Sequence, residues 1–205
     1  MDPERPEDPT RRRLLQIGAG IGSLVASWPG RAWADPASLT SDRGRQMNTT
    51  GFEVPRGDTR TGEHFQMKGV TTNTLDVKVS GADTDGRLAV LEQIGQSPNG
   101  GPPLHAHLDQ DEIFIGVEGR YRFVLGGRAL ELGPGDVIFA PRGVPHAFMQ
   151  RTEVARMQLV YQPAGLIEDF FRATASWTSP PSTDEIARVF AAHGMRVLGP
   201  PLKPD

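Results

Sequence analysis

The 205-residue sequence contains no cysteine. This excludes disulfide bonds and thiolate metal ligands together, and it leaves histidine and carboxylate side chains as the good ligands for a metal ion. Positive charge is not in excess either, because 22 Lys and Arg stand against 25 Asp and Glu and the formal net charge is −3. We therefore expect no basic surface of the kind that binds nucleic acid.

Long apolar periods are also scarce, whereas the chain holds 24 glycines and 18 prolines. Short apolar runs separated by turn residues are typical of an all-β barrel or sandwich. The length allows one ordinary domain and hardly two. The expected strands are residues 65–70, 75–80, 87–94, 113–117, 120–125, 128–132, 137–140, 146–150 and 155–161. Gly126-Gly127, between two of these runs, predicts a two-residue hairpin turn.

The first 34 residues are interpreted as an export signal and not as part of the fold. The segment Thr10-Arg11-Arg12-Arg13-Leu14-Leu15-Gln16 resembles the twin-arginine export motif, with glutamine in place of the usual final lysine. Residues 17–28 are apolar but too few to span a bilayer, and Ala32-Trp33-Ala34 is a small-x-small cleavage signature.

The alternative is a basic tail on a cytoplasmic protein, but the order and spacing of the parts favour the signal. We expect the twin-arginine export machinery to act on the chain. The mature protein would begin near Asp35, be periplasmic or secreted, and keep no stable membrane span after cleavage.

The stretch that carries the most chemical information runs over residues 100–146. His105 and His107 are two positions apart, so on a strand both point to one face, about 7 Å apart along the chain. Glu112 opens an apolar run soon afterwards, and His146 follows a turn-rich segment. Three imidazoles and one carboxylate suit a divalent first-row metal ion, with positions left open for water or substrate.

Two other carboxylates, those of Asp109 and Asp111, are near enough to compete with Glu112 as the ligand. We prefer Glu112 because it stands at the start of the apolar run. The two remaining histidines, His64 and His193, are assigned structural or surface roles.

This spacing resembles that of the cupin family. The first cupin motif is met, with a spacer one residue short, by Gly100, His105, His107, Glu112 and Gly119. The second is met by Gly135, Pro141, Gly143 and His146, and Gln150 stands where asparagine is usual. The resemblance implies an all-β jelly-roll barrel (a double-stranded β-helix) and a metal ion bound by His105, His107, Glu112 and His146.

We divide the chain on this basis into an arm or linker over residues 35–64, a cupin barrel over 65–162 and a helical extension over 163–205. The extension is marked by a capping box that begins at Ser182 and by Gly194, which is placed to end a helix. Its helices are expected to serve packing or dimer contact, and a homodimer is one partner arrangement that they allow.

The C-terminal part is similar to small single-domain bacterial cupins grouped with quercetin 2,3-dioxygenase. That resemblance implies a dioxygenase-type oxidoreductase for a small enolisable or phenolic substrate, with iron, manganese, nickel, cobalt, copper or zinc as the ion. Glu112 would be both ligand and base. Apolar walls would come from Phe114, Phe123, Phe139, Phe148, Met149, Met157 and Tyr161. The alternatives are an exported cupin that binds a metal or small ligand without catalysis, and a sugar isomerase that uses zinc.

Overall fold

The computed structural model describes residues 50–68 and 71–204. The twin-arginine motif, the cleavage signature and the first part of the expected arm lie outside these residues. Within them, no helix is long and apolar enough to cross a membrane.

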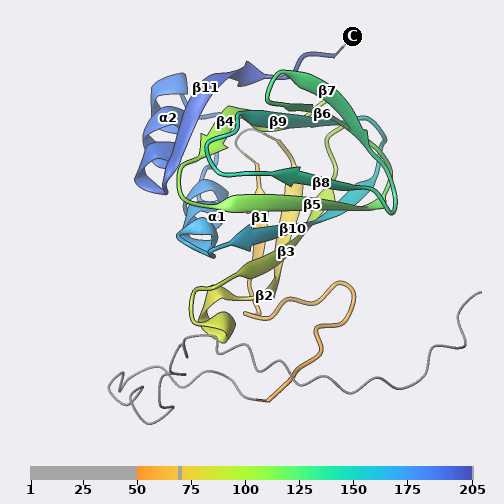
Figure 1. Cartoon of the computed structure of the whole chain (residues 1–205), viewed down its shortest axis with the longest axis vertical. Helices are drawn as coiled ribbons and strands as arrows, with labels where there is room; N and C mark the ends of the chain where they lie inside the picture. The colour runs from red at the N-terminus through yellow and green to blue at the C-terminus, as the bar shows by residue number, and fades with distance from the viewer. Residues whose placement is uncertain (1–49, 69–70, 205) are drawn as a thin grey trace, which may run out of the picture. The chain divides into compact units, whose positions relative to one another are not determined.

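Two antiparallel sheets make up the body of the described domain (Figure 1). The first sheet has the order β1 (His64–Met67), β2 (Asn73–Val79), β3 (Ala89–Gly95), β10 (Ala155–Gln162), β5 (Asp111–Glu118) and β8 (Val137–Ala140). The second has the order β11 (Met195–Pro201), β4 (Pro103–His107), β9 (His146–Gln150), β6 (Tyr121–Leu125) and β7 (Arg128–Leu132). Neighbours in both sheets are mostly distant in sequence, as the jelly-roll prediction requires.

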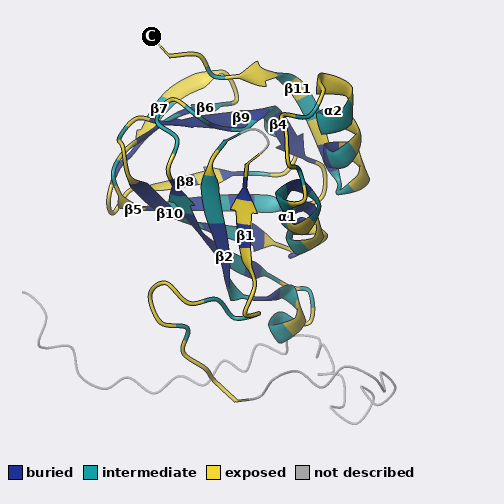
Figure 2. Ribbon diagram, turned by 180° about the vertical axis from the view of Figure 1, so that it is seen from behind, coloured by how far each residue is buried: buried dark blue, intermediate teal, exposed yellow. Residues whose placement is uncertain are grey.

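The core lies between the sheets, because alternate side chains of each strand point inward. Strand β8 shows the alternation plainly: Ile138 and Ala140 are buried whereas Val137 and Phe139 are exposed. Figure 2 shows buried residues concentrated on the strands and exposed ones on turns and outer edges. The inward aromatic rings of Phe114 and Phe123 meet edge to face, with centroids 4.9 Å apart.

The hairpin predicted at Gly126-Gly127 is present between β6 and β7. Its backbone geometry explains why glycine occupies both turn positions. Both glycines have positive φ, 56° and 82°. A two-residue hairpin with positive φ at both positions favours glycine because any Cβ there would be strained.

The C-terminal extension contains α1 (Ile167–Ala175) and α2 (Thr183–Ala192), which lie together beside one end of the sheets (Figure 1). As the capping box predicts, the Ser182 hydroxyl accepts a hydrogen bond from the Glu185 amide. Helix α1 is joined to the turn after β2, because the Glu168 carboxylate accepts hydrogen bonds from the Ser80 hydroxyl and the Gly81 amide.

Strand β11, by contrast, was not expected from the sequence. It is the edge strand of its sheet and pairs with β4, placing Val197 opposite His105. Gly199 and Pro201 argue against a strand in a central position, but an edge strand needs fewer ladder hydrogen bonds and tolerates both.

Candidate metal centre

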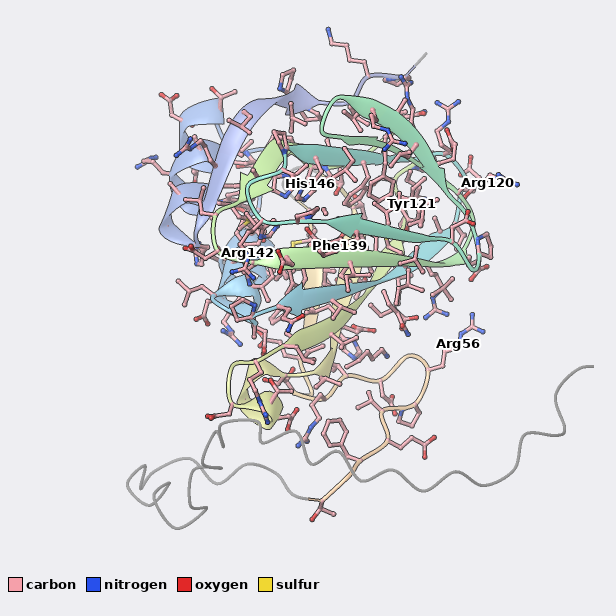
Figure 3. The ribbon with its side chains drawn as sticks, in the orientation of Figure 1. Arg56, Arg120, Tyr121, Phe139, Arg142 and His146 are labelled. Carbon is pink, nitrogen blue, oxygen red and sulfur yellow. The ribbon has the colours of Figure 1, made fainter. Side chains whose placement is uncertain are left out.

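Four side chains from three strands converge between the sheets. Strand β4 supplies His105 and His107 from positions two apart, β9 supplies His146, which pairs in register with His105, and β5 of the other sheet supplies Glu112. All four are buried, and their ligand atoms lie within 4.8 Å of one another. His146 can be followed in Figure 3. The structure thus brings together the four residues that were predicted from the sequence as metal ligands.

Backbone carbonyls fix the orientation of two of the imidazoles. The Nδ1 atom of His105 lies 2.8 Å from the Pro103 carbonyl oxygen, and that of His146 lies 3.0 Å from the Val144 oxygen. A carbonyl oxygen only accepts, so each Nδ1 carries the hydrogen and each Nε2 keeps its lone pair for the centre of the cluster. This arrangement is typical of metal-binding histidines.

The side chain of Gln110 fixes the orientation of the His107 imidazole, and this role was not predicted from the sequence. Its Nε2 donates to the carbonyl oxygens of Pro163 and Ala164, at 3.0 and 2.6 Å. The Oε1 atom is therefore left as the acceptor for Nδ1–H of His107, at 3.0 Å. Gln110 thereby connects a candidate ligand with the chain that leads into α1.

The distances to Glu112 provide a test of whether these residues fit a metal ion. Oε2 of Glu112 lies 3.1 Å from Nε2 of His107 and 3.1 Å from Nε2 of His146. If Nδ1 carries the hydrogen, each Nε2 directs a lone pair at an anionic oxygen, and only a proton or a cation between them removes the repulsion. Three neutral nitrogen donors and a carboxylate suit a divalent transition metal ion, so the residues fit one. The buried cluster could hold such an ion, as is typical of cupins.

The electrostatics of the metal-free cluster favour a charged carboxylate. Burial opposes the shift, but hydrogen bonds with His107 and His146 hold the pKa of Glu112 well below its ordinary value. Against the same burial, Glu112 raises the pKa of His107. Burial and the neighbouring imidazoles lower the pKa of His105 to about 3. At neutral pH His105 is therefore a neutral nitrogen donor facing an ionised carboxylate.

The competing carboxylates lie outside the cluster. Asp111 precedes Glu112 on β5 and so points to the other face, where its two oxygens accept hydrogen bonds from the Arg142 backbone amide and guanidinium, at 2.9 and 2.8 Å. These hydrogen bonds lower the pKa of Asp111 to about 2. Arg142 is labelled in Figure 3. Asp109 is exposed.

The two remaining histidines have local partners. His64 lies with Nδ1 2.7 Å from the buried Asp76 carboxylate, and His193 follows α2 with Nδ1 2.7 Å from the Val189 carbonyl oxygen. Neither lies in the cluster of candidate ligands.

Tyr161 is a further residue of the site. It pairs in register with Glu112 across β10 and β5, and both residues line the same cavity. Burial raises the pKa of Tyr161 well above its ordinary value, and the charge of Glu112 adds to the effect. The phenol therefore stays protonated beside the carboxylate. The sequence suggested Tyr161 only as one of several wall residues.

The cluster faces a cavity of about 110 Å³. Of the proposed wall residues, Phe114, Phe148 and Tyr161 line it, whereas Phe139 is 53% exposed on the outer surface. Phe123, Met149 and Met157 are buried in the core away from the cavity lining. The extension contributes Ile167, Phe170, Phe171, Thr174, Trp177 and Phe190. The helical periodicity indicated an apolar face on these helices, but not that this face would line the cavity.

Comparison with known proteins agrees with this architecture. Residues 95–161 match the family described as the cupin domain. An uncharacterised protein of Streptomyces coelicolor is 33% identical over 54 residues, which are 26% of this chain and 51% of the relative. The chain thus spans about half the length of this curated relative.

Solved structures of similar fold include three bacterial proteins. KdgF from a Halomonas species is 17% identical with a TM-score of 0.47, covering 56% of this chain and 94% of its own. The polyketide cyclase RemF from Streptomyces resistomycificus is 29% identical with a TM-score of 0.46, covering 55% and 80%. An RmlC-like cupin from Shewanella frigidimarina is 21% identical with a TM-score of 0.44, covering 53% and 87%. The cupin-domain match over residues 95–161 and the two antiparallel sheets agree with an all-β cupin jelly roll that has a short helical extension.

Proposed function

We propose that this protein is a metal-dependent oxidoreductase of the dioxygenase type that acts on a small enolisable or phenolic substrate. One observation carries the proposal. Three histidines and Glu112 form one buried cluster, and His105, His107 and Glu112 of this cluster line a cavity whose other described lining residues are apolar or uncharged. These residues would hold a redox-capable ion, which would supply a route for electrons from an enolate or phenolate substrate to O₂.

The cavity chemistry argues against a sugar isomerase. None of the described residues that line it is lysine or arginine. A phosphorylated sugar would need such a cation to pair with its phosphate. For a neutral sugar, the uncharged partners outside the ligand cluster include Thr71, Asn73, Gln93 and Thr174, in a lining that is otherwise mostly apolar. Each sugar hydroxyl left unpaired costs about 1–3 kcal/mol. A flat molecule with one polar edge meets neither penalty.

Within this proposal each group of the cavity has a separate role in the reaction. The ionised Glu112 accepts the proton of the substrate hydroxyl, which requires that it bind the ion only loosely at that moment. Tyr161 stays protonated next to Glu112 on the neighbouring strand, and it is an uncharged polar group of the cavity wall. The phenylalanine rings of the cavity exclude water and place the apolar body of the substrate.

The proposal includes the location of the protein. The motifs within residues 10–34 support export by the twin-arginine route and a periplasmic or secreted mature form. That route carries proteins already folded, so the ion would be selected in the cytoplasm before export.

The experiment is to prepare metal-free protein, reload it separately with iron, manganese, cobalt, nickel, copper and zinc, and follow O₂ uptake with catechols, flavonols and 1,3-diketones. We expect turnover with at least one redox-capable ion and none with zinc, whose filled d shell exchanges no electrons. Turnover with zinc alone would indicate an isomerase or hydrolase. Tight metal binding without turnover for any ion would indicate an exported binding protein.

A further inference from the structure

The size and lining of the cavity point to a more specific substrate class. We infer that the metal-facing cavity takes a molecule with a single ring, such as a monocyclic catechol or enol, and that the C-terminal extension sets this limit. The inference rests on the proposed function, because it takes from that function the assumption that the ligand carries enol or phenol oxygens on the edge that faces the metal ligands.

The first step is the volume. The cavity measures about 110 Å³. An apolar protein cavity of about 150 Å³ holds one benzene molecule. A single ring is therefore close to the limit here, and a three-ring flavonol is not contained unless the walls move.

The second step is the position of the phenylalanine rings of α1 and α2 relative to the candidate metal ligands. The lining contains His105, His107 and Glu112 together with Phe170 and Phe190 from α1 and α2. The rings of Phe170 and Phe190 meet edge to face with centroids 4.8 Å apart, and Phe190 in turn meets the ring of His105 at 5.2 Å. Phe190 thus stands directly beside a candidate ligand, and removal of its ring would extend the cavity next to the cluster.

The third step concerns polarity. Among the described lining residues, charged groups are confined to the candidate metal ligands, and the phenylalanine rings offer no hydrogen-bond partners. The uncharged polar side chains of the lining are those of Thr71, Asn73, Gln93, Tyr161, Thr174 and Trp177. A ligand with its oxygens on one edge and an apolar ring behind them matches this division. Trp177, which also lines the cavity and is partly exposed, gives a fluorescent reporter of occupancy.

The test uses the full chain loaded with zinc, so that ligands bind without turnover. Catechol, naphthalene-2,3-diol and 3-hydroxyflavone are titrated while Trp177 fluorescence and calorimetric heat are recorded; the first two share the diol and differ by one ring. We expect catechol to bind at least about tenfold more tightly than the naphthalenediol, within the range by which pocket size discriminates ligands. The fluorescence response should be lost in Trp177→Phe, which assigns the response to the tryptophan that lines the cavity.

Variants assign the limit to the extension. Phe190→Ala should bring the affinities for the one-ring and two-ring diols within about threefold of each other, a residual of under 1 kcal/mol. Phe171→Ala, at a less buried ring, gives a second enlargement should Phe190→Ala unfold. Phe139→Ala is the matched control, because this phenylalanine, labelled in Figure 3, is exposed and lines no part of the cavity.

The outcomes separate this inference from the proposed function. If 3-hydroxyflavone or the naphthalenediol binds the wild type as tightly as catechol, the size limit is wrong even if O₂ uptake is observed. If no diol binds to the zinc-loaded protein, the inference is likewise overturned. If catechol is preferred and Phe190→Ala relaxes the preference, the size limit stands even when no ion supports O₂ uptake, and only the dioxygenase proposal fails.

Discussion

At the scale of single residues, the site is defined by which nitrogen atom of each imidazole already forms a hydrogen bond within the protein. The Nδ1 atoms of His105, His107 and His146 each face a carbonyl oxygen, so all three Nε2 atoms are left for one point in space. The carboxylate that faces this point is that of Glu112, because the side chains of neighbouring residues on a strand alternate. The preceding carboxylate is held outside by Arg142.

The first prediction contrasts two neighbouring carboxylates. Glu112→Gln should lower the bound metal by about tenfold or more, as should alanine at His105, His107 or His146, because each change removes one ligand atom. Asp111→Asn should leave the metal content unchanged, since Asp111 pairs with Arg142 on the other face. Elemental analysis of purified variants measures this. Loss of metal from Asp111→Asn with retention in Glu112→Gln would mean that the carboxylate is wrongly assigned.

The second prediction concerns the pH dependence of stability in the metal-free protein. The pKa of His105 is about 3 in the folded chain and 6.5 in the unfolded chain. The unfolded chain therefore binds the extra proton, and the free energy of unfolding should fall as pH drops below about 6.5. His107 does not oppose this, because its pKa is raised and it is protonated in both states below that pH.

Urea denaturation in the presence of a chelator, at pH values between 6.5 and 4.5, measures the effect. Glu112 loses its own contribution only below its unfolded value of 4.5, so this window isolates His105. The variant His105→Leu should show a clearly shallower decline with pH. Equal slopes in the two proteins would show that His105 does not remain neutral in the fold.

At the scale of elements, the sequence predicted the barrel better than the extension. The strands expected over residues 113–117 and 137–140 are present because alternation and turn residues are local signals. The edge strand β11 and the lining role of α1 and α2 were missed. A helix whose apolar face lines a cavity has the same periodicity as one that packs on solid core, and only the tertiary arrangement distinguishes them.

The third prediction concerns the anchoring of α1. Glu168→Ala removes the acceptor for the Ser80 hydroxyl and the Gly81 amide, at 3.0 and 2.7 Å. Leaving these donors without a partner should lower the free energy of unfolding by about 1–3 kcal/mol. Asp169→Ala is the control on the same helix, because Asp169 forms an ion pair with the exposed Arg172, and such surface pairs contribute about 0–1 kcal/mol. Urea denaturation of the metal-loaded proteins measures the free energy of unfolding of both variants. Equal losses in the two would show that the hydrogen bonds of Glu168 add nothing to stability.

At the scale of the whole molecule, the N-terminal motif and the metal cluster support each other. Which ion occupies a site of nitrogen and oxygen donors depends on ion availability as much as on geometry, so a protein that must not take up an abundant competing ion gains from folding before export. The twin-arginine route permits this. The cupin cluster and the export motif are independent features of the sequence, and we treat their combination as one proposal about where the ion is loaded.

The fourth prediction tests export at the arginine pair. Replacing Arg11 and Arg12 together by lysine should leave an uncleaved precursor in the cytoplasm, because a receptor that reads the planar guanidinium fork is not satisfied by an ammonium group. Arg13→Lys is the matched control, since this third arginine occupies the variable position of the motif and its replacement should permit export. Cell fractionation and N-terminal sequencing provide the readout, and the wild-type product should begin at or within a few residues of Asp35.

The metal content of the same fractions tests where the ion is loaded. Precursor trapped by the double substitution should still contain the ion if the cluster is loaded before export. A wild-type product that retains Met1 or Asp2 would rule out the signal peptide, and a metal-free cytoplasmic precursor would place loading after export.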